Sequence, residues 1–234
     1  MSNLDILCFA AHPDDVELSC GGTIAKHIDL GYTIGICDLT RGELGTRGNA
    51  ETRRDEALNA SKILNIKYRE NLGLQDGFFD INEQNIIDVV KIIRKYKPKI
   101  VLCNATHDRH LDHSRAGDLV VRAAFLSGLV KINTNQDAWR PSVVYRYIQD
   151  YHNTPDFVVD ISKYMDIKLE AIKAYATQFY NIHSKELETP ISKKDFFDFI
   201  IARAKEFGRP AGFEFAEGFN KERYIGIENL FHLI

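Results

Sequence analysis

The sequence predicts an α/β fold, a Rossmann-like three-layer sandwich with a mostly parallel sheet. Two observations support this prediction. Apolar runs typical of buried strands alternate with helical stripes through the first two thirds of the chain. Clusters of His and Asp directly follow two of these runs, at residues 12–15 and 107–113. Alternating strands and helices favour parallel strands with right-handed crossovers, and ligands bind at the carboxyl ends of such strands.

The predicted strands are short apolar segments bounded by turn residues. The first is the clearest, because it is almost continuously apolar up to Ala11. Another is followed by the turn sequence Gln75-Asp76-Gly77. In chain order, the strands are expected at residues 4–11, 32–39, 67–72, 99–103, 142–147 and 157–160.

The predicted helices are recognised from apolar residues at helical spacing and from their end signals. Gly31 is a typical residue to follow a helix end. Asn82 and Ser162 are suitable N-caps, and Pro98 stops the helix before it. In chain order, the helices are expected at residues 21–30, 51–64, 82–96, 113–129, 162–176 and 193–207.

Composition indicates one globular domain spanning residues 1–234, because 44% of the residues are hydrophobic and 27% are charged. A net charge of -3 argues against a nucleic-acid binder, which needs excess cationic side chains to bind phosphates. The four cysteines form no C-x-x-C pair and suit a reducing compartment. No apolar run approaches the roughly 18 residues of a membrane span. We therefore expect a cytoplasmic protein that binds neither nucleic acid nor membrane.

The two polar clusters predict a metal site assembled from two strand ends. Zinc in a hydrolytic site takes three protein ligands from His and Asp or Glu and keeps one position open. His12, Asp15 and His113 supply that set. The Asp14 side chain is expected to point in a different direction from that of Asp15, because adjacent residues in an extended turn direct their side chains differently. It is then free to act as the general base for an attacking water.

The second cluster also offers a catalytic histidine. His110 lies three residues before His113 and is expected to face the opposite side of the substrate. Asp112 is expected to orient the His110 ring and to favour its protonated form, as a buried Asp does for other catalytic histidines. A protonated His110 would stabilise an oxyanion and protonate a leaving amine.

These residues resemble the opening signature of the LmbE / PIG-L superfamily of zinc-dependent N-acetylglucosaminyl deacetylases. The resemblance covers nearly the whole chain. Within the superfamily it is strongest to the bacillithiol-biosynthesis (BshB) branch, whose members deacetylate N-acetyl-alpha-D-glucosaminyl L-malate. The matching segments are Ala11-His12-Pro13-Asp14-Asp15, Gly21-Gly22-Thr23, residues 40–48, residues 51–56, His110-Leu111-Asp112-His113 and residues 215–219.

The resemblance implies the same roles for the metal ligands, for Asp14 and for His110 supported by Asp112. It also implies that Arg53 and Asp76 hold the sugar. Two departures stand out: Leu111 replaces the usual Pro, and Asp108 occupies a position where the mycothiol branch has Tyr. Relatives often form trimers or hexamers, so a homo-oligomer is expected.

Three further residues are predicted to bind substrate from their own chemistry. Arg47 and Glu43 lie in a Gly-rich loop that lacks either phosphate-binding pattern, so a mobile substrate loop is expected. Arg109 adjoins His110 and suits a carboxylate clamp, because guanidinium pairs bidentately with carboxylates. A malate aglycone would supply such carboxylates.

Several alternatives remain open at this point. The substrate could instead be N-acetylglucosamine, a chitooligosaccharide or a bacillithiol S-conjugate. A metal-bound sugar-binding module without turnover and a nucleotide-binding oxidoreductase represent two other classes. One Zn²⁺ per chain is expected, although imidazole and carboxylate ligands also suit Fe(II), Co or Mn.

Overall fold

The computed structural model describes residues 3–233. Seven strands form one sheet in the order β3-β2-β1-β4-β5-β7-β6. The predicted α/β class is confirmed: β1 to β5 are parallel, and β7 runs antiparallel to both of its neighbours. The strands are β1 (Ile6–Ala10), β2 (Ile34–Thr40), β3 (Tyr68–Leu74), β4 (Ile100–Asn104), β5 (Val143–Tyr147), β6 (Phe157–Asp160) and β7 (Ala216–Lys221).

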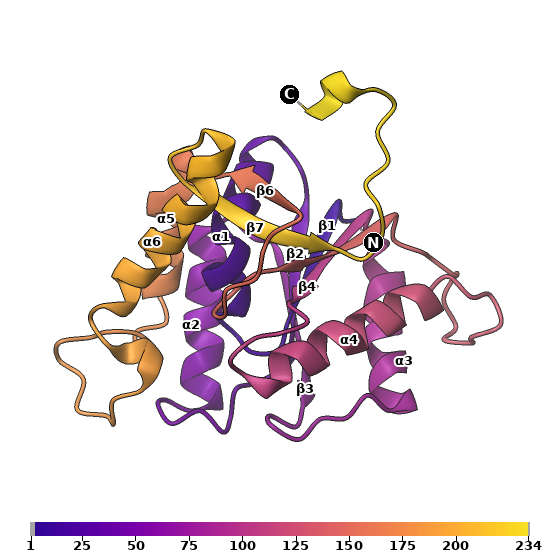
Figure 1. The fold of residues 1–234 in the computed structure, drawn as a ribbon. Coiled ribbons are helices and arrows are strands. Elements are labelled where there is room, and N and C mark those ends of the chain that lie inside the picture. Colours follow the sequence, from indigo (N-terminus) through magenta and orange to yellow (C-terminus); the bar gives the residue numbers. More distant parts are fainter. Residues whose placement is uncertain (1–2, 234) are drawn as a thin grey trace.

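Helices cover both faces of this sheet (Figure 1). Helices α3 and α4 pack together on one face, while α1, α2, α5 and α6 lie on the other. Their bounds are α1 (Asp15–Asp29), α2 (Ala50–Ile63), α3 (Glu83–Tyr96), α4 (Leu111–Leu126), α5 (Met165–Lys173) and α6 (Phe196–Gly208). Within residues 3–233, no helix combines the length and apolar character needed to cross a membrane.

Strand β1 is buried along its entire length and has β2 on one side and β4 on the other. The chain builds the sheet outward from β1 through β2 to β3, then returns to the opposite side of β1 with β4. The carboxyl ends of β1 and β4 therefore flank the point where the strand order reverses. This is where ligands bind in open α/β sheets.

Helix α1 differs from the prediction, because it begins at Asp15 instead of at the glycine pair. A kink at Cys20 interrupts it, which explains why the sequence suggested a later start. The freed N–H groups of Gly22 and Thr23 donate to the Glu217 carboxylate at 3.0 and 2.7 Å. Lys168 Nζ lies 2.5 Å from the same carboxylate. These contacts tie α1 to β7 and α5, so the helix that carries Asp15 is firmly held.

Strand β7 was not predicted from the sequence. It inserts between β5 and β6, which consequently are not neighbours. Both predicted ends of α3 are confirmed: Asn82 caps it by accepting from the Asn85 N–H, and it ends at Tyr96 before Pro98. The predicted N-cap at Ser162 is wrong, because Ser162 begins a short 3-10 turn (Ser162–Tyr164) and α5 follows without a side-chain cap. Helix α2 has a capping box in which Asn49 and Thr52 bond reciprocally.

Candidate active site

The turn after β1 brings three polar side chains to the edge of the sheet. His12, Asp14 and Asp15 are all buried, and all three line a cleft of about 590 Å³. Asp14 has a φ of 118°, in the region that L-residues rarely adopt. Such a conformation costs on the order of 1–3 kcal/mol and is typical of functional sites. Asp14 occupies the N-cap position of α1 but makes no capping hydrogen bond, so its carboxylate remains available to the cleft.

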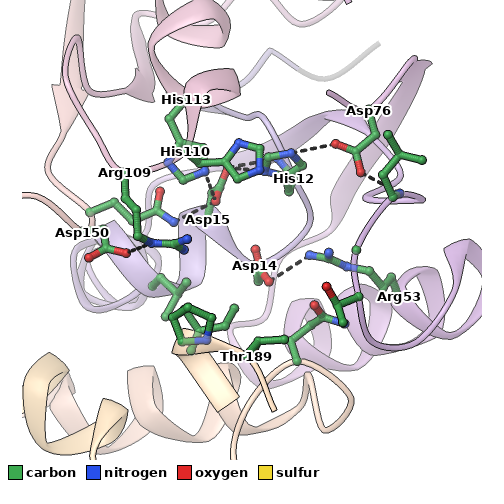
Figure 2. A pocket seen from close by; sticks show the side chains of 18 of the residues that line it. His12, Asp14, Asp15, Arg53, Asp76, Arg109, His110, His113, Asp150 and Thr189 are labelled. Atoms are coloured by element: carbon green, nitrogen blue, oxygen red, sulfur yellow. Dashed lines mark hydrogen bonds and ion pairs between the residues drawn. The ribbon is translucent and has the colours of Figure 1, made fainter. Parts of the chain in front are cut away.

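Asp15 lies between the two histidines that were predicted as its fellow ligands (Figure 2). Its Oδ1 is 3.1 Å from His113 Nε2, and its Oδ2 is 3.8 Å from His12 Nδ1. Asn104 Nδ2 and Gln149 Nε2 donate to the two oxygens at 3.1 and 2.8 Å. The fold thus places the three predicted ligands together from the ends of β1 and β4.

A second carboxylate orients each of these histidine rings. His113 Nδ1 lies 2.6 Å from Asp108 Oδ2, and His12 Nε2 lies 3.0 Å from Asp76 Oδ1. With those nitrogens donating, His113 Nε2 and His12 Nδ1 are left as acceptors that face Asp15. Histidine ligands of metal ions are held by this kind of outer carboxylate. The donor set therefore fits a divalent metal ion.

The electrostatics of the cluster lead to the same conclusion. Although burial opposes it, contacts with Asp112 and Asp76 raise the pKa of His12 to about 9. Burial is likewise outweighed at His113, where Asp15 and Asp108 raise the pKa to about 10. The surrounding carboxylates thus favour positive charge on both rings. A divalent cation would supply that charge in place of the two protons.

His110 offers a further nitrogen to the same space. Ligand atoms of His12, His110 and His113 all lie within 4.8 Å of one another, as do those of His12, Asp76 and Asp112. Neither of these two groups includes Asp15, so the geometry also permits a ligand set in which His110 takes the place of Asp15. Measuring the metal content of Asp15 and His110 variants distinguishes the ligand set that contains Asp15 from the set that contains His110.

The Asp112 charge acts in the predicted direction, because it opposes the burial that lowers the pKa of His110, but within residues 3–233 no hydrogen bond joins the Asp112 carboxylate to the His110 ring. Asp112 contacts the His110 ring through its backbone, whose N–H donates to Nδ1 at 3.2 Å. The Asp112 carboxylate instead accepts from the Gly77 N–H at 2.8 Å and pairs with Arg115 at 2.8 Å. It also lies 3.4 Å from His12 Nε2. His110 is the N-cap of α4, and this position turns its Nδ1 toward the helix.

The surroundings of His110 disfavour the protonated form that was predicted. Burial, together with the nearby charges of His12 and His113, lowers its pKa to about 4. Because its Nδ1 accepts a hydrogen bond, the neutral ring carries its proton on Nε2. His110 can therefore donate a hydrogen bond to an oxyanion but holds no extra proton at neutral pH.

Asp14 is paired with Arg53 from the first turn of α2. Arg53 Nη2 lies 2.9 Å from Asp14 Oδ2 and also donates to the Pro13 carbonyl. Burial raises the pKa of Asp14 to about 7, although the Arg53 charge lowers it. Gly42, at a φ of 64°, allows the guanidinium to pass, since a Cβ there would meet Arg53 Nη1 at 2.5 Å.

Of the residues predicted to bind substrate, Arg53, Asp76 and Arg109 line the cleft. Each of them is already engaged with the protein. Asp76 accepts from His12 and from the Leu44 N–H at 2.9 Å. Arg109 Nε lies 2.5 Å from Asp150 Oδ2. In Figure 2, the Arg109–Asp150 pair and the Arg53 guanidinium lie on opposite sides of Asp14.

The two predicted substrate residues of the Gly-rich loop do not line this cleft. Glu43 Oε1 accepts from the Asp76 N–H at 3.0 Å and so positions the residue that orients His12. Arg47 is buried, lies 3.5 Å from Glu186, and donates to the Phe179 carbonyl at 3.4 Å. Glu43 is exposed and Arg47 is buried, and the contacts of both join loops around the cleft.

Sequence reasoning missed the polar residues that hold Asp15 and His113. Asn104 ends β4, Gln149 follows β5, and Asp108 lies within the second cluster. Their position immediately after predicted strands was the available signal. It was weak, since Asn, Gln and Asp are also ordinary turn residues.

Residues 7–124 match the family model described as GlcNAc-PI de-N-acetylase, or PIG-L. The chain belongs to the PIG-L family. A diacetylchitobiose deacetylase from Thermococcus kodakarensis is 29% identical over 91% of this chain and 81% of its own. A probable N-acetyl-alpha-D-glucosaminyl L-malate deacetylase 2 from Bacillus subtilis is 27% identical over 81% of this chain and 90% of its own. The crystal structure of a conserved protein from Thermus thermophilus has 33% identity and a TM-score of 0.87, covering 96% of this chain and 98% of its own.

Membership of the PIG-L family identifies the chain as an enzyme of the deacetylase type. The predicted superfamily is confirmed. The branch within it is not decided by these relatives, because two with different substrates are about equally similar. The PIG-L match includes β4 and most of β1 and α4, and hence both polar clusters.

Proposed function

We propose that this chain is a zinc-dependent N-deacetylase acting on an N-acetylglucosamine conjugate, with N-acetyl-alpha-D-glucosaminyl L-malate as its preferred substrate. The observation that carries this proposal is the convergence on Asp15 of two histidine nitrogens, each oriented by an outer carboxylate. The ionisable Asp14 lies beside them in a cleft large enough for a sugar conjugate.

In this proposal, His12, Asp15 and His113 hold one zinc ion per chain. When bound there, the ion lowers the pKa of the attacking water and polarises the amide carbonyl. Asp14 accepts the proton that the water loses as it attacks the carbonyl carbon. It returns that proton to the nitrogen as the C–N bond breaks, which releases acetate and a free amine.

Neutral His110 stabilises the oxyanion through its Nε2–H. A preorganised donor of this kind is worth about 10²–10³ in kcat. Asp112 is a positioning residue. Its carboxylate accepts from the Gly77 N–H and its backbone N–H donates to His110 Nδ1, so it links residue 77 to the start of α4 and positions the His110 ring. Arg53 stabilises the ionised form of Asp14 and holds it against the cleft.

The second candidate substrate is N,N'-diacetylchitobiose, favoured by the similarity to the Thermococcus relative. The malate conjugate is preferred because Arg203, whose guanidinium pairs with no carboxylate within residues 3–233, also lines the cleft. Carboxylates of an acidic aglycone are natural partners for guanidinium groups.

Acetate release from the malate conjugate, diacetylchitobiose and free N-acetylglucosamine tests the proposal. We expect the highest kcat/KM for the malate conjugate, and activity that is lost to a chelator and restored by zinc. Parallel titrations with Co, Mn and Fe(II) identify the most effective metal. Failure of the metal-loaded protein to release acetate from all three substrates would refute the proposed activity.

A further inference from the structure

One arginine of the cleft, Arg203, differs from the others in its hydrogen bonds and ion pairs. Arg203 lies on α6, and its side chain lines the same cleft as Asp14 and His110. Its Nη1 atom is buried yet has no hydrogen-bond partner in the described part of the chain. No hydrogen bond or ion pair joins Arg203 to any residue within 3–233. Its one charge–ring contact is with Phe199 on its own helix, where the guanidinium carbon lies 4.9 Å from the ring centroid.

Single buried nitrogens without a partner also occur on Arg47, Arg53 and Arg146, but each of those guanidinium groups bonds through its other nitrogens. Within residues 3–233, the Arg203 guanidinium bonds through none. Arg69 forms ion pairs with Asp38 and Glu17 at 2.8 and 2.6 Å. Arg94 donates to the carbonyls of three residues that follow α4. Arg146 pairs with Asp118 at 2.9 Å. A buried cation that lacks a partner is costly, because it has lost water without gaining an anion.

The same contrast holds within the cleft. Its three arginines are Arg53, Arg109 and Arg203. The first is paired with Asp14 and the second with Asp150, at 2.9 and 2.5 Å. The Asp150 charge that faces Arg203 is thus already shared with Arg109. Burial lowers the pKa of Arg203, and the carboxylates around it, Asp150 foremost, do not offset that effect.

We propose that Arg203 binds an anionic group of the substrate's aglycone and thereby makes this enzyme selective for acidic N-acetylglucosamine conjugates. This inference rests on the proposed deacetylase activity. It replaces the predicted role of Arg109, whose Nε is held by Asp150. The planar guanidinium of Arg203 can take a carboxylate or a phosphate in bidentate fashion. Both groups are anionic and offer oxygen acceptors to the guanidinium.

The apolar part of the cleft lining fits this arrangement. Pro190, Ile191 and Phe196 line the cleft together with Arg203. Charge-assisted hydrogen bonds are stronger in such surroundings than in water. The sugar end of a conjugate would then reach the histidine cluster while its acidic end meets α6.

Substitution of Arg203 by Gln tests the inference with three substrates. N-acetyl-alpha-D-glucosaminyl L-malate carries carboxylates, N-acetylglucosamine 1-phosphate carries a phosphate, and N,N'-diacetylchitobiose is neutral. We expect kcat/KM for the malate conjugate to fall about 10- to 150-fold, chiefly through KM, as for the loss of a charge-assisted hydrogen bond. The loss for the neutral disaccharide should be much smaller, and a matching loss for the phosphate alone would identify phosphate as the natural anion.

Lys205→Gln is the matched control, because it removes one positive charge from the same helix at an exposed position outside the cleft. Arg203→Lys should keep part of the selectivity that Arg203→Gln loses, since lysine retains the positive charge but cannot bind a carboxylate in bidentate fashion. Thermal unfolding of each variant shows whether a loss of activity reflects misfolding. An equal loss on acidic and neutral substrates by a folded Arg203→Gln protein would overturn the inference.

Binding measurements keep this test independent of turnover. Calorimetric titration of the malate conjugate into Asp14→Asn and into the Asp14→Asn/Arg203→Gln double variant compares affinities directly. We expect the double variant to bind at least 10-fold more weakly. Equal affinities would refute the role of Arg203 even if the enzyme is a deacetylase. If wild type releases no acetate from any substrate, the proposed activity fails, and the titration still decides the role of Arg203.

Discussion

Replacement of Arg53 by Gln should separate the control of Asp14 from sugar binding. In the structure, the Arg53 guanidinium lies 2.9 Å from the Asp14 carboxylate in a buried environment. Its charge lowers the pKa of Asp14, which burial raises to about 7. Without Arg53, only burial and the like charges of Asp15 and Glu17 remain as major influences, together with His12. The pKa of Asp14 must then rise.

The sign and size of the effect on activity follow from the role of Asp14 as base. Only the ionised carboxylate accepts a proton, so a higher pKa moves the acidic limb of the pH–rate profile to higher pH. Loss of an adjacent Arg charge should move its midpoint by about 1–3 pH units. Below the limb the ionised fraction falls about tenfold per pH unit, which predicts a loss on the order of 10- to 1,000-fold. A bound cation lowers the midpoint of the acidic limb alike in wild type and in Arg53→Gln. The quantity to measure is therefore the difference between these two midpoints.

The assay is kcat/KM for acetate release as a function of pH, in wild type and Arg53→Gln. Activity of the variant should recover in alkaline buffer, where Asp14 ionises again. Arg54→Gln is the matched control, because Arg54 is the neighbouring residue of α2 and its side chain is 68% exposed. The reasoning is refuted if the acidic limb of Arg53→Gln keeps its wild-type midpoint while KM alone rises. Arg53 would then bind the sugar, as the family resemblance implied.

Three further predictions concern the metal ligands and the base. His12→Ala, Asp15→Ala and His113→Ala should each lose metal and activity together; elemental analysis checks this, and stoichiometric metal with full turnover removes that residue from the ligand set. Asp14→Asn should keep its metal but lose about 10²–10⁴ in kcat, together with the acidic limb that Asp14 causes; loss of metal instead would mean that Asp14 and Asp15 exchange roles. Asp108→Asn should weaken metal binding about 10- to 100-fold, because the outer carboxylate orients His113; competition with a chromogenic chelator measures this, and unchanged affinity contradicts the arrangement.

Much of the fold was predictable from the sequence because its signals are local. Apolar runs and helical stripes determine which residues must be buried, and Asn82 and Pro98 mark helix ends through the hydrogen bonds they can or cannot make. The two His and Asp clusters were predictable for the same reason. Each follows a buried strand directly, and parallel strands place their carboxyl ends at one edge of the sheet.

Only the tertiary structure decided what each of these side chains contacts. Asp76, Glu43 and Arg47 were predicted to bind substrate, yet they bond to protein groups that are distant in the sequence. The ionisation of His110 likewise depends on burial and on the charges of His12 and His113, which no local pattern encodes. The position of Arg203 depends on how α6 packs against α1, α2 and α5. Residue types and strand ends are properties of the sequence, whereas pairing, burial and charge balance arise only when separate segments meet.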